Sequence, residues 1–186
     1  MTIRTLSLFN TGLFLNPVDE DKANDENYTP THIVEPLITL IGQPFDLDVF
    51  SCERANQVIK AKHYFTKRDD AFSQDLTSYQ NKFFQPPFSM MDRATELLLE
   101  YAHIGNSFML CNSNTSSDWF LDCQNYSQCY LTYKKRIDFT NPKLDGTGKK
   151  QDNNRASQTL FLFSETIAPH QFKKALNHLG NVGKTI

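Results

Sequence analysis

Residues 86–111, PPFSMMDRATELLLEYAHIGNSFMLC, make up the stretch that most constrains the fold. Apolar side chains recur in it every three and four residues, the spacing that places them on one buried face of an α-helix. Ser89 with Asp92 resembles a capping box at the start of that helix, and Gly105 can close its end in the left-handed conformation. Residues 107–111 then form a short apolar run typical of a strand. The stretch therefore predicts a helix, a glycine turn and a strand.

The rest of the chain predicts further helices and strands around this unit. Residues 30–41 and 169–179 have helical spacing, and residues 55–84 repeat apolar side chains every seven positions, which favours one long helix or two stacked ones. Strands are expected at residues 5–15, 45–50, 119–123, 129–139 and 159–163. We therefore expect a single α+β domain over residues 1–186. It would have an antiparallel sheet of about four to six strands, packed on one face by two main helices, and a C-terminal helix.

The formal net charge of −2 hides an uneven distribution of charge. Residues 1–50 hold eight acids and two bases, whereas the remaining residues hold thirteen acids and seventeen bases. Turn formers and charged residues dominate residues 19–28, which we interpret as an acidic loop, and residues 141–157, which we interpret as a mobile basic loop. Aromatic residues make up 12% of the chain and supply apolar area for a folded core. The composition thus predicts a folded domain with two polar loops.

The signatures of phosphate and zinc sites are incomplete. The tripeptide GKT at residues 183–185 resembles the end of a phosphate-binding loop, but position 178 lacks the glycine that such a loop needs. The four cysteines lie too far apart in sequence to supply the close ligand pairs with which structural zinc sites begin. We therefore expect no cofactor and no bound metal.

Two catalytic alternatives stay open. Asp46 and Asp48 alternate with apolar residues, so both would lie on the solvated face of a strand, where they could hold a metal in a nuclease-like site. A cysteine hydrolase would need a cysteine beside His103, His170 or His178, an adjacency that the sequence cannot establish. A solvated strand face and buried thiols are the simpler interpretations of these residues.

The strongest candidate for a binding surface is the strand expected at residues 130–136, YLTYKKR, with the basic loop that follows it. Residues 134–155 hold seven bases and three acids. An aromatic side chain with cations on an open sheet face can hold single-stranded nucleic acid by stacking and by phosphate contacts, although an edge strand protected by lysines has the same composition. The candidate nucleic-acid-binding residues are Tyr130, Lys134, Arg136, Lys143, Lys149, Lys150 and Arg155.

Because no catalytic signature is complete, the sequence favours a non-enzymatic binding or accessory protein that acts through a macromolecular protein partner. Single-stranded nucleic-acid binding through residues 130–136 and 141–155 is the first alternative, and a metal-dependent nuclease or a cysteine hydrolase is the second. No apolar run reaches the roughly 18 residues that a membrane span needs, and no secretory cleavage site follows the N-terminal residues. We expect a cytoplasmic protein that makes no membrane contact.

Overall fold

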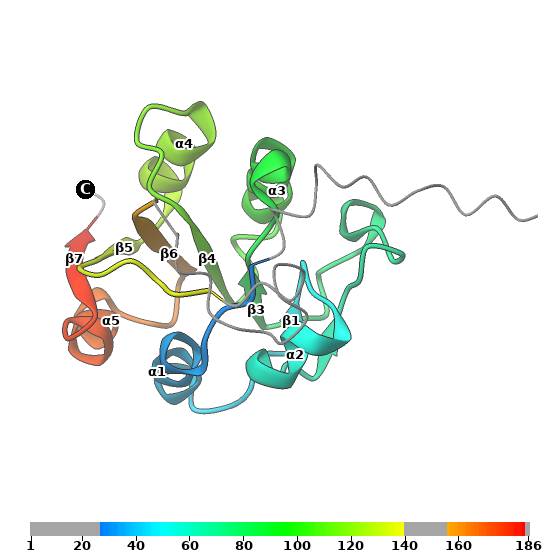
Figure 1. The fold of residues 1–186 in the computed structure, drawn as a ribbon, viewed down its shortest axis with the longest axis horizontal. Helices are drawn as coiled ribbons and strands as arrows, with labels where there is room; N and C mark the ends of the chain where they lie inside the picture. The colour runs from blue at the N-terminus through cyan, green and yellow to red at the C-terminus, as the bar shows by residue number, and fades with distance from the viewer. Residues whose placement is uncertain (1–26, 140–155, 185–186) are drawn as a thin grey trace, which may run out of the picture.

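The structure, a computed structural model, describes residues 27–139 and 156–184 (Figure 1). Its helices are α1 (Thr31–Ile41), α2 (Glu53–Ile59), α3 (Met91–Glu100), α4 (Asp118–Tyr126) and α5 (Pro169–Leu176), with the 3₁₀ turns η2 (Ala71–Ser73) and η3 (Phe88–Met90). Its strands are β1 (Leu47–Asp48), β2 (His63–Tyr64), β3 (Asn81–Phe84), β4 (Asn106–Asn112), β5 (Cys129–Tyr133), β6 (Gln158–Ser164) and β7 (Gly180–Lys184). The strand expected at residues 5–15 lies outside the described residues, as do most of the two expected loops. None of the helices in the described ranges is long and apolar enough to cross a membrane.

The seven strands of the described residues form one mixed sheet, in the order β2-β1-β3-β4-β6-β5-β7. The first four strands in that order are parallel, whereas β6 runs antiparallel between β4 and β5, and β7 pairs antiparallel with β5. The α+β class is confirmed. The expectation of an antiparallel sheet of four to six strands is wrong, because long connections between the first four strands allow them to pair in parallel.

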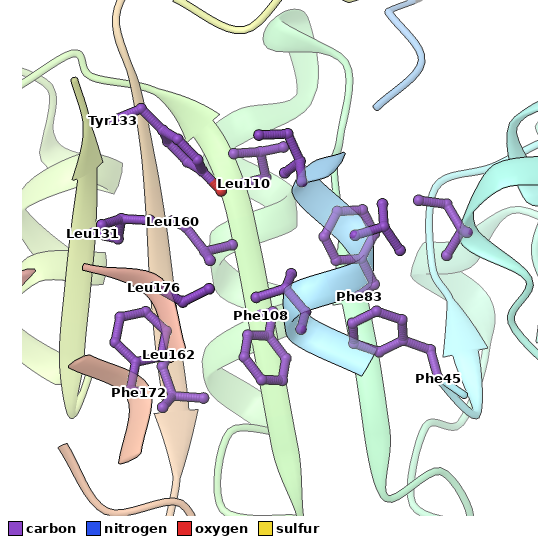
Figure 2. Close-up of a cluster of buried hydrophobic side chains, with 14 of the residues drawn as sticks. Phe45, Phe83, Phe108, Leu110, Leu131, Tyr133, Leu160, Leu162, Phe172 and Leu176 are labelled. Atoms are coloured by element: carbon purple, nitrogen blue, oxygen red, sulfur yellow. The ribbon is translucent and has the colours of Figure 1, made fainter. Parts of the chain in front are cut away.

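Helices cover both faces of the sheet, so the expectation that they pack on one face alone is wrong (Figure 1). One buried cluster joins α1 and α5 to side chains of the central strands, among them Phe108 and Leu160 (Figure 2). The other cluster joins α3 and α4 to the alternate side chains of the same strands, among them Met109 and Phe161. Burial on both faces explains why β4 and β6 are continuous apolar runs in the sequence.

The stretch at residues 86–111 folds as a helix, a glycine turn and a strand, as the sequence predicts. It forms α3 and β4, and Gly105 between them has a φ of 63°. The start of the helix differs from the expected capping box. Ser89 lies in η3, and Met90 is the N-cap residue without a side-chain cap hydrogen bond. The helix α3 therefore follows directly on the 3₁₀ turn η3.

Replacing Gly105 with alanine is expected to lower the free energy of unfolding by at least about 2 kcal/mol. Its backbone conformation is strained for a residue with a Cβ, and an added Cβ would overlap the main-chain carbonyl of Gln80. Gly42 supplies a matched control, because its φ is 72° but no atom lies within 4 Å of an added Cβ, so Gly42→Ala should cost only about 1 kcal/mol. Urea denaturation measures both, and equal losses would contradict a role for the Gln80 contact.

Residues 55–84 do not form the long helix that the seven-residue repeat favours. The helix α2 covers only seven residues, and β2, η2 and β3 follow it. Polar side chains bond to nearby backbone groups here: Asn56 contacts both the N–H and the carbonyl of Ala61, at 2.9 and 3.1 Å. Asp69 likewise accepts from the N–H of Thr66 at 2.7 Å. Such local bonds compete with the backbone hydrogen bonds of a longer helix, which explains why α2 does not continue.

One further expectation fails in the C-terminal half. Residues 119–123 belong to α4 and do not form a strand. A short apolar run cannot by itself distinguish a strand from a buried turn of helix. Gly180 and Gly183 lie in β7, where Gly180 passes so close to the Thr132 backbone that a Cβ would not fit.

Candidate active site

A cavity of about 950 Å³ opens where the parallel strands end. Its wall comes mainly from the carboxyl ends of β1 and β4 and from the segments after β1, β2 and β3: residues 48–52, 65–68, 70–72, 85–90 and 110–112. The chain passes from β1 to β2 on one side of β1 and then to β3 on the other side. Such a reversal leaves a crevice outside the carboxyl ends of the strands, where open α/β sheets bind their ligands. The topology therefore makes this cavity the candidate ligand site.

Asp48, the last residue of β1, is a buried carboxyl group in the wall of the cavity. Only 2% of its surface is exposed, and burial raises its pKa to about 7, although hydrogen bonds from Ser51 and from the Phe50 backbone oppose the shift. Its Oδ1 atom has no hydrogen-bond partner among the described residues. Because a buried acceptor without a partner is costly, this atom suits a ligand group that donates a hydrogen bond. The expectation that Asp48 lies on a solvated strand face is wrong.

Asp46 has a different environment from Asp48, so the two carboxyl groups do not form the expected pair. Its Oδ1 accepts from Lys62 Nζ at 2.7 Å, and its Oδ2 accepts from the backbone N–H of Asn81 at 2.9 Å. Partial burial raises the pKa of Asp46, but these hydrogen bonds outweigh that effect and leave the pKa below its usual value. Asp46 is therefore a structural ion-pair partner between the starts of neighbouring strands, and it does not line the cavity.

Gln85 directly follows β3 and is held by the segment that precedes α1. Its Nε2 donates to the main-chain carbonyl of Asn27 at 2.6 Å, and its Oε1 accepts from the hydroxyl of Thr29. Gln85, Asn27 and Thr29 all line the cavity. The carboxamide of Gln85 is therefore fixed in the cavity wall by its hydrogen bonds to Asn27 and Thr29.

Pro86, Pro87 and Phe88 continue the cavity wall from Gln85. Proline has no backbone N–H, so the two prolines can offer a ligand only carbonyl acceptors. Phe88 is 52% exposed and Met90 is 37% exposed, although both line the cavity. Exposed apolar side chains beside a cavity are typical of a contact surface for a flat, partly apolar ligand.

Basic side chains lie at the rim of the cavity. Lys67 and Arg68 are exposed lining residues between β2 and η2, and they are accompanied by one acid, Asp70. The guanidinium of Arg93 stacks on the ring of Phe72, another lining residue, at 3.9 Å. Cations in this position can bind phosphate groups of a ligand that reaches the cavity from solvent.

The residues predicted to bind nucleic acid do not line this cavity where the structure describes them. Tyr130 lies in β5, and its ring centroid is 5.9 Å from that of Phe161. Because β5 ends at Tyr133, Lys134 and Arg136 are exposed residues of the next segment and do not share a strand face with Tyr130. The other four candidates, Lys143, Lys149, Lys150 and Arg155, lie outside the described residues. The contact of all seven with nucleic acid stays a prediction.

The environments of the cysteines do not favour a cysteine hydrolase. Burial raises the pKa of Cys123 and of Cys129 to about 12, and it raises the pKa of Cys111 well above its usual value. A nucleophilic cysteine needs a lowered pKa, so these three thiols are inert core groups. Cys52 has a structural role, because its Sγ accepts from the N–H of Ala55 at the start of α2.

Sequence reasoning considers Asp48 only as a possible metal ligand beside Asp46, and it does not identify Gln85 or Phe88 as site residues. The signal for Gln85 and Phe88 was the run of two prolines and an aromatic residue at positions 86–88, shortly after Phe83 and Phe84. Two prolines interrupt the hydrogen bonds of a strand, so they indicate an extended segment at the end of a strand. We interpreted this run only as the start of a helix.

Residues 18–184 match the model of a protein family described as DNA N-6-adenine-methyltransferase (Dam). The match includes every helix and strand of the described residues. A search of curated proteins finds no match. A family of DNA-modifying enzymes overturns the expectation of a non-enzymatic accessory protein that acts through a protein partner, and it agrees better with the nucleic-acid alternative. The chain belongs to the DNA N-6-adenine-methyltransferase (Dam) family.

Proposed function

We propose that this protein transfers a methyl group to the N6 amine of an adenine in DNA, at the cavity beside β1 and β3. The observation that carries the proposal is the segment Gln85-Pro86-Pro87-Phe88, which lines that cavity with hydrogen-bond acceptors and an exposed aromatic ring. The family match supplies the reaction class.

The amine of adenine is a hydrogen-bond donor and a weak nucleophile, because its lone pair is delocalised into the ring. Acceptors that bind its hydrogens hold the nitrogen in place and increase its electron density. Gln85 Oε1 and the carbonyl groups of Pro86 and Pro87 are the acceptors that we assign to this task. The prolines bring no N–H that would repel the amine.

An adenine inside a duplex cannot reach a cavity in a protein, so the target base must leave the base stack. Phe88 is the residue that we assign to receiving it. Its side chain is 52% exposed and lines the cavity, so a purine could stack on its ring without any rearrangement of the core. Base–aromatic stacking of this kind contributes about 1–3 kcal/mol per base.

A methyltransferase also needs a methyl donor, and the residues of the cavity fit S-adenosylmethionine. The volume of about 950 Å³ suits a ligand of that size. The buried Oδ1 of Asp48 needs a donor, which a hydroxyl or ammonium group of this cofactor would provide, and apolar lining residues such as Val49 and Phe50 would contact its rings. When bound, S-adenosylmethionine supplies an electrophilic methyl group on a sulfonium centre. This proposal differs from the expectation, drawn from the sequence, that the protein has no cofactor.

DNA is the macromolecular partner that this function requires. Lys67 and Arg68 at the rim are the cations that we assign to the phosphates beside the extruded nucleotide. Lys134 and Arg136, two of the predicted nucleic-acid-binding residues, follow β5. They would contact phosphates farther from the target base if the duplex extends toward β5. Neither set of contacts needs a protein partner.

The direct test is methyl transfer by the full chain to DNA that contains no N6-methyladenine. The purified protein would be incubated with methyl-labelled S-adenosylmethionine, and the DNA would be digested to nucleosides for mass spectrometry. We expect label in N6-methyladenine, and we expect none when the same DNA has first been saturated with N6-methyladenine at all target sites. Label only in methylcytosine, or no transfer to any DNA, would contradict the proposed function.

A further inference from the structure

The contacts of the Gln85 carboxamide fix which of its two polar atoms occupies each position. A main-chain carbonyl can only accept a hydrogen bond, so the atom that faces the carbonyl of Asn27 at 2.6 Å must be the amide nitrogen. The oxygen must then be the atom that faces the Thr29 hydroxyl, and that hydroxyl donates to it. The hydrogen-bond pattern around Gln85 therefore excludes the flipped amide.

Thr29 is well placed to hold this orientation. Only 3% of its surface is exposed, and it lies directly before Pro30, the N-cap residue of α1. The neighbouring Tyr28 accepts from the thiol of Cys52 at 3.3 Å, which ties the same segment to the start of α2. Residues 27–29 thus lie between two helices and present a fixed hydroxyl and a fixed carbonyl to Gln85.

The orientation of the amide decides which bases the site accepts. An amide oxygen accepts from an exocyclic amine, as in adenine, but it repels the keto oxygen that guanine, thymine and hypoxanthine carry at the equivalent position. A freely rotating glutamine could turn its NH₂ group toward a keto oxygen and would discriminate poorly. An amide whose oxygen and nitrogen are both bonded to the protein cannot make that change without losing those bonds.

We propose that Thr29 is a positioning residue, which with the carbonyl of Asn27 keeps the Oε1 of Gln85 toward the target base and so makes the site selective for amino bases over keto bases. This inference rests on the proposed function, because it assumes that the target base meets Gln85. The role proposed for Thr29 is in base selectivity, and it requires no ligand or metal beyond those of the proposed function.

The test compares adenine with hypoxanthine, which has nearly the same shape but carries a keto oxygen in place of the amine. A target sequence would first be identified in DNA methylated by the wild-type protein. Duplexes with either base at that target, each opposite an abasic site so that extrusion breaks no base pair, would be titrated by fluorescence anisotropy. S-adenosylhomocysteine would be present, so that binding is measured without transfer. The variants are Thr29→Val, which keeps the shape but removes the hydroxyl, and Thr29→Ser, which keeps the hydroxyl.

We expect the wild type and Thr29→Ser to prefer adenine over hypoxanthine by the same factor within about twofold, and Thr29→Val to lose about 3- to 10-fold of that preference. Thermal denaturation checks that both variants fold, and a purely structural role would weaken binding of the two duplexes equally. An unchanged preference in Thr29→Val, or an equal loss in Thr29→Ser, would overturn the inference while the wild type still methylates DNA. If the wild type methylates no DNA, the proposed function itself fails, and this inference fails with it.

Discussion

Asp48→Asn is expected to weaken binding of S-adenosylmethionine by about 10- to 100-fold, because the variant loses a charged acceptor that has no partner in the described protein. The same change should stabilise the fold above neutral pH. The pKa of Asp48 is about 7 in the folded protein, well above the value of 3.8 for an exposed aspartate, so the folded state favours the neutral acid. The wild type therefore loses stability as the pH rises from about 4 to about 7, on the order of a few kcal/mol in total.

The measurement combines denaturation at several pH values with calorimetric titration of the cofactor. Near pH 4 the two proteins should have similar stability, and at pH 8 the variant should be the more stable one. Asp46→Asn is the matched control, because Asp46 lies on the same segment but bonds to Lys62 and Asn81 outside the cavity. That control should bind the cofactor normally and lose some stability. Unchanged cofactor affinity in Asp48→Asn would show that Asp48 does not hold this ligand.

Phe88→Ala is expected to lower kcat/KM for DNA by about 10- to 100-fold, because the extruded base loses the ring on which it would stack. The fold should change little, because the side chain is already 52% exposed and belongs to neither buried cluster. Phe88→Tyr keeps the aromatic face and should keep most of the activity. Steady-state methylation of one DNA substrate at several concentrations measures this effect.

Two outcomes of the Phe88 experiment would contradict the assignment. Full activity in Phe88→Ala would exclude a stacking role for the ring. An equally large loss in Phe88→Tyr would indicate that the position matters for packing or backbone geometry. Cofactor affinity should stay within a few-fold of the wild type in both variants, which separates a loss of DNA substrate from a loss of methyl donor.

The sequence predicts well those parts of the fold whose pattern is local. The stretch around α3 and β4 contains its own helical spacing, its own glycine turn and its own apolar strand, so neighbouring residues decide the outcome. The same holds for α1, whose apolar residues recur at helical spacing and which forms one continuous helix although it contains Pro36. Local patterns cannot reveal which strands become neighbours. The parallel pairing of β1 with β2 and β3 joins residues far apart in sequence through strands of two to four residues.

The candidate site was missed for the same reason. Asp48 occupies a position that alternation assigns to solvent, but its register partner Phe83 belongs to the buried cluster of α1 and α5, so this face of the sheet is covered as well, and Asp48 lies in the cavity wall. Gln85 becomes a site residue only because β3 ends beside β1, and its partner Thr29 lies 56 positions earlier in the chain. The basic segment after Tyr130 was proposed as a binding surface because its charged residues are close together in the sequence, so no tertiary structure is needed to recognise them.

The unequal lengths of the strands divide the sheet into two halves with different resistance to local opening. β4 and β6 pair over seven residues each, whereas β1 and β2, which carry the cavity, pair over two. Backbone hydrogen bonds in the long ladder should therefore open rarely, and those beside the cavity often. Ligands that contact the loops after β1, β2 and β3 would add contacts that the short ladders lack, so ligand binding should make the hydrogen bonds of these ladders open less often.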